Sequence, residues 1–252
     1  MRQLGKASLF TLTLILGSTL FLSEANAQRR FGGASRAMAG GSMSLGLGIS
    51  TVSAGQDDMD RIIDDAVDAN GANTKNLGAA WEAYANFIYR FDRSMYAFVF
   101  RPSYFTQEST GSGTGGSYDY KLSGFTVFPI LRLYPLENSF IKFFMQAGLG
   151  YGTLNGDITA AANNLKFKGS AFGAMGGVGV DFCFTDAHCL TVEGNLRYMP
   201  IERNLTTGGN CTGGAIPGVS QCGGTSEVER DGSDLGTTMS GVQGLVGYTL
   251  NF

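Results

Sequence analysis

The chain has little charge and a single histidine. Charged residues make up 15% of the 252 residues, and the formal net charge is −3. This balance gives no reason to expect binding to nucleic acid. The one histidine, His188, is expected in a solvated turn, which argues against a hydrolase that uses a Ser-His-Asp arrangement. A site with histidine metal ligands is equally disfavoured, so the sequence predicts no metal and no cofactor.

Long apolar runs are also scarce, because only residues 7–22 form one. Arg2 and Lys6 precede this run, and Ala25-Asn26-Ala27 follows it as a small-x-small cleavage site. We therefore predict a signal peptide at 1–27 and a flexible, Gly-rich lead-in at 28–41. An uncleaved anchor helix is the alternative, but the run is short and contains five Ser/Thr residues. No later run is long enough for a membrane-spanning helix.

Beyond the lead-in, apolar and polar residues alternate with a period of two, which is the pattern of β-strands. The fourth segment is apolar on both parities in its second half, so a bulge near Gly124 is expected. Eight segments show the pattern: 42–52, 79–91, 94–106, 118–134, 140–152, 168–184, 189–201 and 235–252.

The connections between these segments alternate between long and short. The short ones lie at 92–93, 135–138 and 185–188, and the long ones at 53–78, 107–117, 153–167 and 202–234. Long loops on one side, short turns on the other and an even strand count are typical of an outer-membrane barrel. We predict an all-β, eight-stranded antiparallel transmembrane β-barrel over 42–252, in the cell outer membrane, with both termini in the periplasm.

Aromatic residues on the expected lipid face support this orientation, because barrels carry aromatic girdles at both membrane interfaces. A soluble β-sandwich is the alternative, but it would bury large aromatics in a core. The outer girdle is expected from Trp81, Tyr104, Tyr118, Tyr120, Tyr151 and Tyr198, and the inner one from Phe91, Tyr96, Tyr134, Phe182, Tyr248 and Phe252.

The last strand carries a resemblance to a known family. The chain ends Gly247-Tyr248-Thr249-Leu250-Asn251-Phe252, with alternating bulky residues and a terminal Phe. This resembles the OmpA/OmpX-like outer-membrane barrels, whose end is read by the barrel-assembly machinery. The resemblance implies an assembly signal at Gly247, Tyr248, Leu250 and Phe252, while Leu245 departs from the pattern. It implies no peptidoglycan-binding domain, since the chain stops at the barrel.

Four cysteines in an exported chain predict disulfides. Cys183 and Cys189 flank the third short turn, whereas Cys211 and Cys222 lie in the last long loop. A bilayer core of about 30 Å separates these pairs, and a disulfide requires Cα atoms within about 7 Å. We therefore predict Cys183–Cys189 and Cys211–Cys222, with free thiols as the alternative.

Charged and amide side chains occupy the parity expected to face the barrel interior. An eight-stranded barrel is just wide enough for side chains to fill, so charges there should pair. The predicted network is Glu82, Arg90, Arg101, Lys142, Asp181, Glu193 and Arg197, within a wider interior set that adds Asn86, Asp119, Lys121, Gln146, Asn195 and Gln243.

Residues 56–71 interrupt the strand pattern. Met59, Ile62, Ile63, Ala66 and Val67 recur with helical spacing, which predicts an amphipathic helix with its aspartates facing away. A helix packed on the barrel rim is the simpler interpretation. A cap over the barrel mouth, or a divalent-cation bridge to lipopolysaccharide, is the alternative.

Together these patterns predict a non-enzymatic, monomeric outer-membrane barrel with a structural or surface-interaction role and an interior plugged by charge pairs. A narrow channel for small solutes or ions is the alternative. The expected partners are outer-membrane lipid and lipopolysaccharide, the barrel-assembly machinery, and an extracellular ligand bound through the long loops.

Overall fold

The computed structural model describes residues 41–91, 94–224 and 226–252. The predicted signal peptide, the lead-in except Gly41, and the turn at 92–93 lie outside the described residues. Among the described residues, no helix combines the length and apolar character required to cross a membrane.

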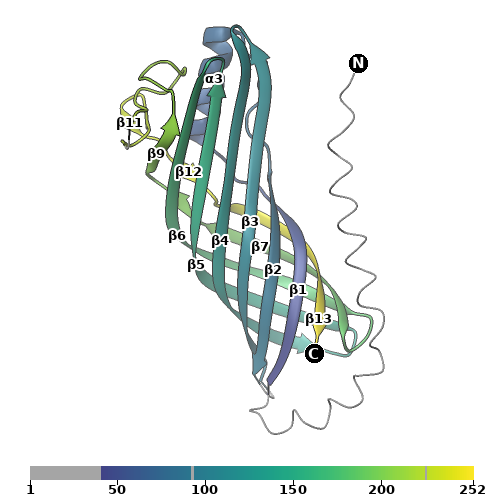
Figure 1. The fold of residues 1–252 in the computed structure, drawn as a ribbon. Helices are drawn as coiled ribbons and strands as arrows, with labels where there is room; N and C mark the ends of the chain where they lie inside the picture. Colours follow the sequence, from purple (N-terminus) through teal and green to yellow (C-terminus); the bar gives the residue numbers. More distant parts are fainter. Residues whose placement is uncertain (1–40, 92–93, 225) are drawn as a thin grey trace, which may run out of the picture. The chain divides into compact units, whose positions relative to one another are not determined.

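Eight antiparallel strands form a closed ring (Figure 1). Each strand pairs with the next along the chain, β7 pairs with β13, and β13 pairs with β1 to close the ring. The all-β barrel predicted from the sequence is thus confirmed, and a two-sheet sandwich is excluded. The ring consists of β1 (Gly41–Val52), β2 (Ala80–Phe91), β3 (Tyr96–Gly113), β4 (Gly116–Glu137), β5 (Ile141–Ala160), β6 (Asn163–Cys183), β7 (His188–Tyr198) and β13 (Gly241–Asn251).

The alternation of residues separates the inside of the ring from its outside. Along β2, Glu82 and Asn86 are buried inside, whereas Trp81 and Phe87 are exposed outside. Leu149 and Phe172 are also exposed outside, at 71% and 83%. Exposed apolar surface costs about 25 cal/mol per Å² in water, so this outer surface is suited to lipid.

Strand β4 departs from the prediction in its first half. Tyr118, Tyr120 and Leu122 face the interior, while Asp119 and Lys121 point away from it. The β3–β4 register is continuous through Gly124, so the bulge predicted there is wrong, and a register shift against β5 occurs at Leu133/Leu136 instead. The interior parity therefore runs unbroken along β4, which removes Asp119 and Lys121 from the interior set. Of the predicted girdle residues, Tyr118, Tyr120 and Tyr134 are buried inside the structure.

Strands β3 to β6 are much longer than a membrane crossing requires. They contain 18, 22, 20 and 21 residues, against about 9–11 for a transmembrane strand. The stretches 107–117 and 153–167, predicted as long loops, are instead strand extensions that meet at turns 114–115 and 161–162. We call the end of the barrel with these extensions the loop end, and the opposite end, where the chain terminates, the turn end (Figure 1).

The inner face of the extensions is covered by two segments that do not belong to the ring (Figure 1). One contains helix α3 (Asp57–Asn70), which confirms the predicted amphipathic helix; its apolar side buries Met59, Ile62, Ile63 and Ala66. The other, 199–240, contains short strands. These are β8 (Pro200–Ile201), β9 (Asn204–Gly209), β10 (Glu229–Arg230), β11 (Ser233–Asp234) and β12 (Thr237–Thr238).

The outer edges of the extended sheet are also covered. Beyond Thr106, β3 has no pairing with β2. The end of α3 and the residues after it lie along this edge of β3 instead. Asn73 N donates to Ser112 O, and Thr114 N donates to Asn70 O, both at 2.9 Å. At the other edge, β9 pairs with β6. These contacts satisfy edge groups that would otherwise be free to pair with another chain.

Candidate functional site

The centre of the barrel interior is a carboxylate held by two arginines. Glu193 of β7 lies 2.7 Å from Arg101 of β3 and 2.9 Å from Arg132 of β4. Gln146 Nε2 of β5 donates to the same carboxylate at 2.8 Å. All these side chains are buried. Because β3 lies directly opposite β7 in the ring of eight, the contact between Arg101 and Glu193 crosses the lumen and does not merely line its wall.

Amide side chains extend this cluster. Asn86 Oδ1 accepts from Arg101 Nε at 2.6 Å, and Asn195 Oδ1 accepts from Gln146 Nε2 at 2.9 Å. Aromatic rings flank the cations, since Arg132 lies 3.8 Å from the centroid of the Phe144 ring. Such contacts add cation–π attraction to the ion pairs. The central network therefore consists of Glu193, Arg101, Arg132, Gln146, Asn86 and Asn195.

A second ion pair lies nearer the loop end. Arg197 Nη1 is 2.8 Å from Glu82 Oε2, and Arg197 Nε donates to the Met239 carbonyl at 2.6 Å. Asp181 is also buried, and it accepts from the Thr191 hydroxyl at 2.6 Å. The buried charged side chains of the described ranges are three arginines and three carboxylates, so their formal charges cancel: Arg101, Arg132, Arg197, Glu82, Asp181 and Glu193.

Two residues predicted for the network lie elsewhere. Arg90 pairs with Glu137 at the turn end, with Nη1 to Oε1 at 2.7 Å, and Lys142 lies 3.6 Å from the same carboxylate. These side chains are about a quarter to a third exposed. Lys142 is opposite Asp181 in the strand register but forms its ion pair with Glu137 instead. The prediction that Arg90 and Lys142 belong to a buried network is therefore wrong.

Arg132 is the residue that sequence reasoning missed. It lies in a stretch of β4 that is apolar on both parities, because Phe128, Ile130 and Tyr134 also face inward. Among these inward-facing residues of β4, Arg132 is the one that carries a charge. Within 127–136, Arg132 is the only charged residue and the other nine residues are apolar. This pattern could have identified Arg132, because a charged residue in such a stretch requires a buried partner.

Three of the four residues of the predicted assembly signal lie in β13, and the fourth, Phe252, follows it. Tyr248 and Phe252 are exposed outside, at 46% and 76%. A side chain at Gly247 would collide with the Tyr84 hydroxyl, so the interior requires glycine there. Leu245, the departure from the pattern, faces the interior and is buried.

Both predicted disulfides are present. Cys183–Cys189 joins β6 to β7 across the turn-end hairpin, with a Cα–Cα distance of 3.9 Å. Cys211–Cys222 lies in the segment that covers the loop end, with a Cα–Cα distance of 5.8 Å. His188, beside the first disulfide, is exposed, and its Nδ1 lies 2.6 Å from the Tyr248 hydroxyl.

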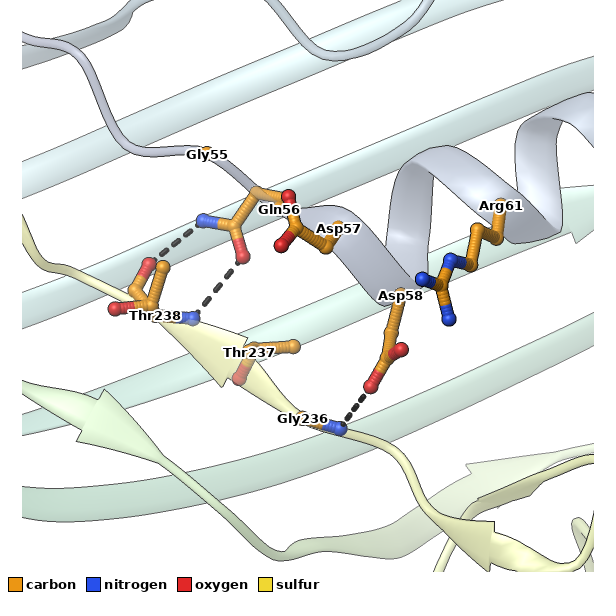
Figure 2. A pocket seen from close by; sticks show the side chains of 8 residues that line it. All are labelled: Gly55, Gln56, Asp57, Asp58, Arg61, Gly236, Thr237 and Thr238. Carbon is orange, nitrogen blue, oxygen red and sulfur yellow. Dashed lines mark hydrogen bonds between the residues drawn. The ribbon is translucent and has the colours of Figure 1, made fainter.

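The start of α3 is fastened to the last covering strand by a side-chain amide (Figure 2). Gln56 Nε2 donates to Thr238 O at 2.6 Å, and Thr238 N donates to Gln56 Oε1 at 3.0 Å. Asp58 Oδ2 accepts from Gly236 N at 2.9 Å. The Gln56 side chain thus bonds both backbone groups of Thr238, as a neighbouring strand would. These residues line a hollow of about 300 Å³.

We call α3 together with the 199–240 segment the cap. The aspartates of α3 make contacts within it. Asp60 Oδ1 accepts from Leu77 N at 2.8 Å, and Asp65 lies 4.0 Å from Arg230. Burial raises the pKa of Asp60 above its usual value, although the Leu77 N–H opposes this change. These contacts favour the cap interpretation of the helix. Over the described ranges, no three His, Cys, Asp or Glu side chains are placed to hold a metal together.

Replacing Gln56 by alanine tests the fastening of the cap. The change leaves both Thr238 backbone groups without their partner. Because Thr238 is only half-buried, the cost should be lower than the roughly 1–3 kcal/mol of a fully buried group. We expect faster hydrogen exchange at the Thr238 amide and faster proteolysis of 53–79. The exposed Arg61 lines the same hollow, so Arg61→Ala serves as the control and should change neither rate. Equal protection in Gln56→Ala and the wild type would contradict the proposed role of Gln56.

Comparisons with known proteins place the fold. No protein-family model matches the sequence, and no curated protein matches it. Among solved structures, the crystal structure of the outer membrane protein OprG from Pseudomonas aeruginosa matches with a TM-score of 0.52 at 13% identity. The match covers 85% of this chain and 96% of that chain. At this identity the likeness concerns the fold, so the chain has the fold of an outer-membrane β-barrel. The finer likeness to OmpA/OmpX-like barrels stays a prediction.

Proposed function

We propose that the protein is a non-enzymatic, monomeric barrel of the outer membrane with a structural or surface-interaction role, and that its interior does not conduct. The single observation that carries this proposal is the set of buried ion pairs that crosses the lumen at Glu193. The likeness to OprG supports the location. In this placement the loop end faces outside the cell, and the turn end faces the periplasm.

The cap also supports a non-conducting interior. Above the ion pairs, one apolar cluster joins α3, the strand extensions and the 199–240 segment, including Ile62, Phe105, Tyr120, Phe167 and Leu235. Solutes that enter from the loop end meet this apolar core before they reach the network. Surface recognition would then depend on the outside of the cap, where a rigid barrel presents loops to a ligand.

A narrow channel is the second candidate, and one observation favours it. Several buried polar atoms have no partner in the described structure: Arg101 Nη1, Arg197 Nη2, Gln243 Oε1 and Tyr84 Oη. Buried polar groups are normally hydrogen-bonded, so these atoms indicate water inside the barrel. Water that formed a continuous file past Glu82 and Arg197 would provide a path for ions.

Conductance in planar bilayers separates the two candidates. For the wild type we expect no steady open conductance. Arg197→Ala should destabilise the barrel by about 3–5 kcal/mol, because it leaves Glu82 buried without a partner. A steady conductance that shifts toward cations in Arg197→Ala, with unchanged stability, would instead establish the channel. Glu137→Ala serves as the control, since its pairs are at the exposed turn end.

A further inference from the structure

The outer wall of the strand extensions carries basic side chains in a fixed register. Along one cross-strand row, Glu108 of β3 is opposite Lys121 of β4, Lys121 is opposite Asp157 of β5, and Asp157 is opposite Lys166 of β6. In the next row toward the turn end, Asn155 is opposite Lys168. All these side chains point away from the interior. The wall therefore presents Lys121, Lys166 and Lys168 on one continuous sheet surface.

This basic surface lies a short way above the aromatic belt of the same wall. On β4, Lys121 precedes the exposed Phe125 by four residues, and on β6, Lys168 precedes the exposed Phe172 by four residues. Four residues span about 13 Å along a strand, or about 10 Å in height for a tilted strand. Between the levels lie Ser123 and Ser170. The interfacial layer is about 5–8 Å thick on each side, so the lysine backbones lie just above it. Their long side chains can reach down to the lipid headgroups.

Two hollows shape this surface, and both are lined by Thr207 of β9. One, of about 340 Å³, is lined by Lys121, Lys166 and Asp157. The other, of about 450 Å³, is lined by Lys168, Arg203 and Glu227. Each hollow is therefore lined by two basic side chains and one acidic side chain, with Glu108 opposite Lys121 beside the first hollow and Asp234 near Arg203 beside the second.

One basic residue in each hollow is already paired. Lys166 lies 3.7 Å from Asp157, and Arg203 pairs with Glu227 and lies 3.8 Å from Asp234. Lys121 and Lys168 form no salt bridge within the described part of the chain. Both are exposed, with long flexible stems that reach along the wall toward the membrane. The unpaired charge in each hollow thus belongs to a lysine that can move toward an anion.

We propose that this wall binds the phosphorylated sugar headgroup of an outer-leaflet glycolipid, with Lys121 and Lys168 as the main phosphate contacts. The inference rests on the proposed outer-membrane location, which sets the loop end in the outer leaflet. Ser123, Asn155 and Ser170 offer hydrogen bonds to the sugars, and Phe125 and Phe172 lie against the acyl chains. A headgroup with more than one phosphate fits two hollows that each present one lysine without a salt bridge in the described part of the chain.

Lipid binding to the refolded full chain in detergent tests the proposal. The probe is lipid A, the phosphorylated lipid anchor of lipopolysaccharide, and native mass spectrometry counts the bound molecules. A basic side chain near an anionic lipid surface contributes roughly a factor of five. We therefore expect Lys121→Gln/Lys168→Gln to weaken binding about 25-fold. Lipid A from which both phosphates have been removed should bind the wild type as weakly as intact lipid A binds this variant.

Two controls make the result specific. Arg61→Gln/Lys75→Gln removes two exposed charges that line neither hollow and should retain wild-type binding. Lys121→Arg/Lys168→Arg should also retain it. Equal loss in the Arg61/Lys75 variant, or equal binding of the dephosphorylated lipid, would overturn the proposal. Displacement of the lipid by inorganic phosphate at equal concentration would show a free-phosphate site and would also overturn it.

Different measurements test the proposed function. A shift in mobility between unheated and heated samples on gels shows whether each variant is folded, and the conductance measurement is independent of lipid binding. A conducting barrel that still binds phosphorylated lipid would refute the plugged interior and leave this inference intact. A folded, non-conducting barrel without phosphate selectivity would refute the lipid-binding inference and leave the proposed function intact.

Discussion

Replacing Glu193 by glutamine is expected to lower the free energy of unfolding by about 3–5 kcal/mol. The carboxylate is fully buried between Arg101 and Arg132. Without it, two guanidinium groups remain in a confined interior with no counter-charge between them. Urea unfolding of the barrel in lipid, followed by the fluorescence of the single tryptophan, Trp81, measures the change.

Two further variants decide whether charge is the cause. Glu193→Gln combined with Arg132→Met removes one unpaired cation and should recover part of the stability, because Met fills the space beside Phe144 without a charge. Glu137→Gln removes a carboxylate that also has two basic partners but is 30% exposed, so it should cost about 0–1 kcal/mol. Equal costs for Glu193→Gln and Glu137→Gln would show that the lumen is wet and would refute the plugged interior.

Replacing Phe252 by alanine is expected to abolish most assembly of the barrel in cells while leaving the folded barrel as stable as the wild type. The Phe252 side chain is 76% exposed, and the ring is closed at this point by the backbone, where Phe252 N donates to Met43 O at 2.9 Å. Substitution of such a surface residue usually changes stability by no more than about 0.5 kcal/mol. A large effect on assembly would therefore come from recognition of the end of the chain.

Assembly in cells and the stability of the refolded barrel have to be measured separately. The amount of heat-modifiable barrel in cell envelopes measures assembly, and refolding into lipid vesicles measures intrinsic stability. Leu196→Ala is the matched control, because Leu196 is a large outward residue on the neighbouring strand β7, with 67% exposure. Normal assembly of Phe252→Ala, or equal loss in both variants, would contradict a signal at the C-terminus.

The alternation of residues, together with the alternating long and short connections, was sufficient to predict the ring. Parity determines whether a side chain faces lipid or the interior, and in β2 the contrast between Trp81 and Glu82 is unambiguous. The cysteine pairs followed for the same reason, because the order of strands and turns fixes which cysteines share an end of the barrel. Both conclusions depend only on local patterns and on the direction of each strand.

The strand ends were less predictable. Residues 107–117 and 153–167 are rich in Gly, Ser, Thr and Asn, a composition typical of loops. They form strands because an apolar cap covers their inner face, with Phe105, Leu154 and Phe167 packed beneath α3 and the 199–240 segment. That covering comes from distant parts of the chain, so no local window contains it.

The pairing within the interior network also depends on residues that are far apart in the sequence. Parity correctly placed Glu82, Arg101, Asp181, Glu193 and Arg197 inside. Pairing depends on the three-dimensional course of the strands around the ring, which brings Glu193 to Arg101, 92 positions away. In the first half of β4 the parity signal failed. There the inside of the sheet is apolar and the outside is polar, so Tyr120 is buried and Lys121 is exposed, the reverse of the prediction.

The seam between β1 and β13 has a consequence for the order of events during biogenesis. Ser44 and Asn251, which bond across it, are 207 positions apart. No contact of this seam can form until the last strand has been synthesised, and such non-local pairings form slowly. Until then β1 has an open edge that other chains can pair with. A fragment that lacks β13 should remain an open, aggregation-prone sheet, and the complete chain should depend on a holding chaperone during transit.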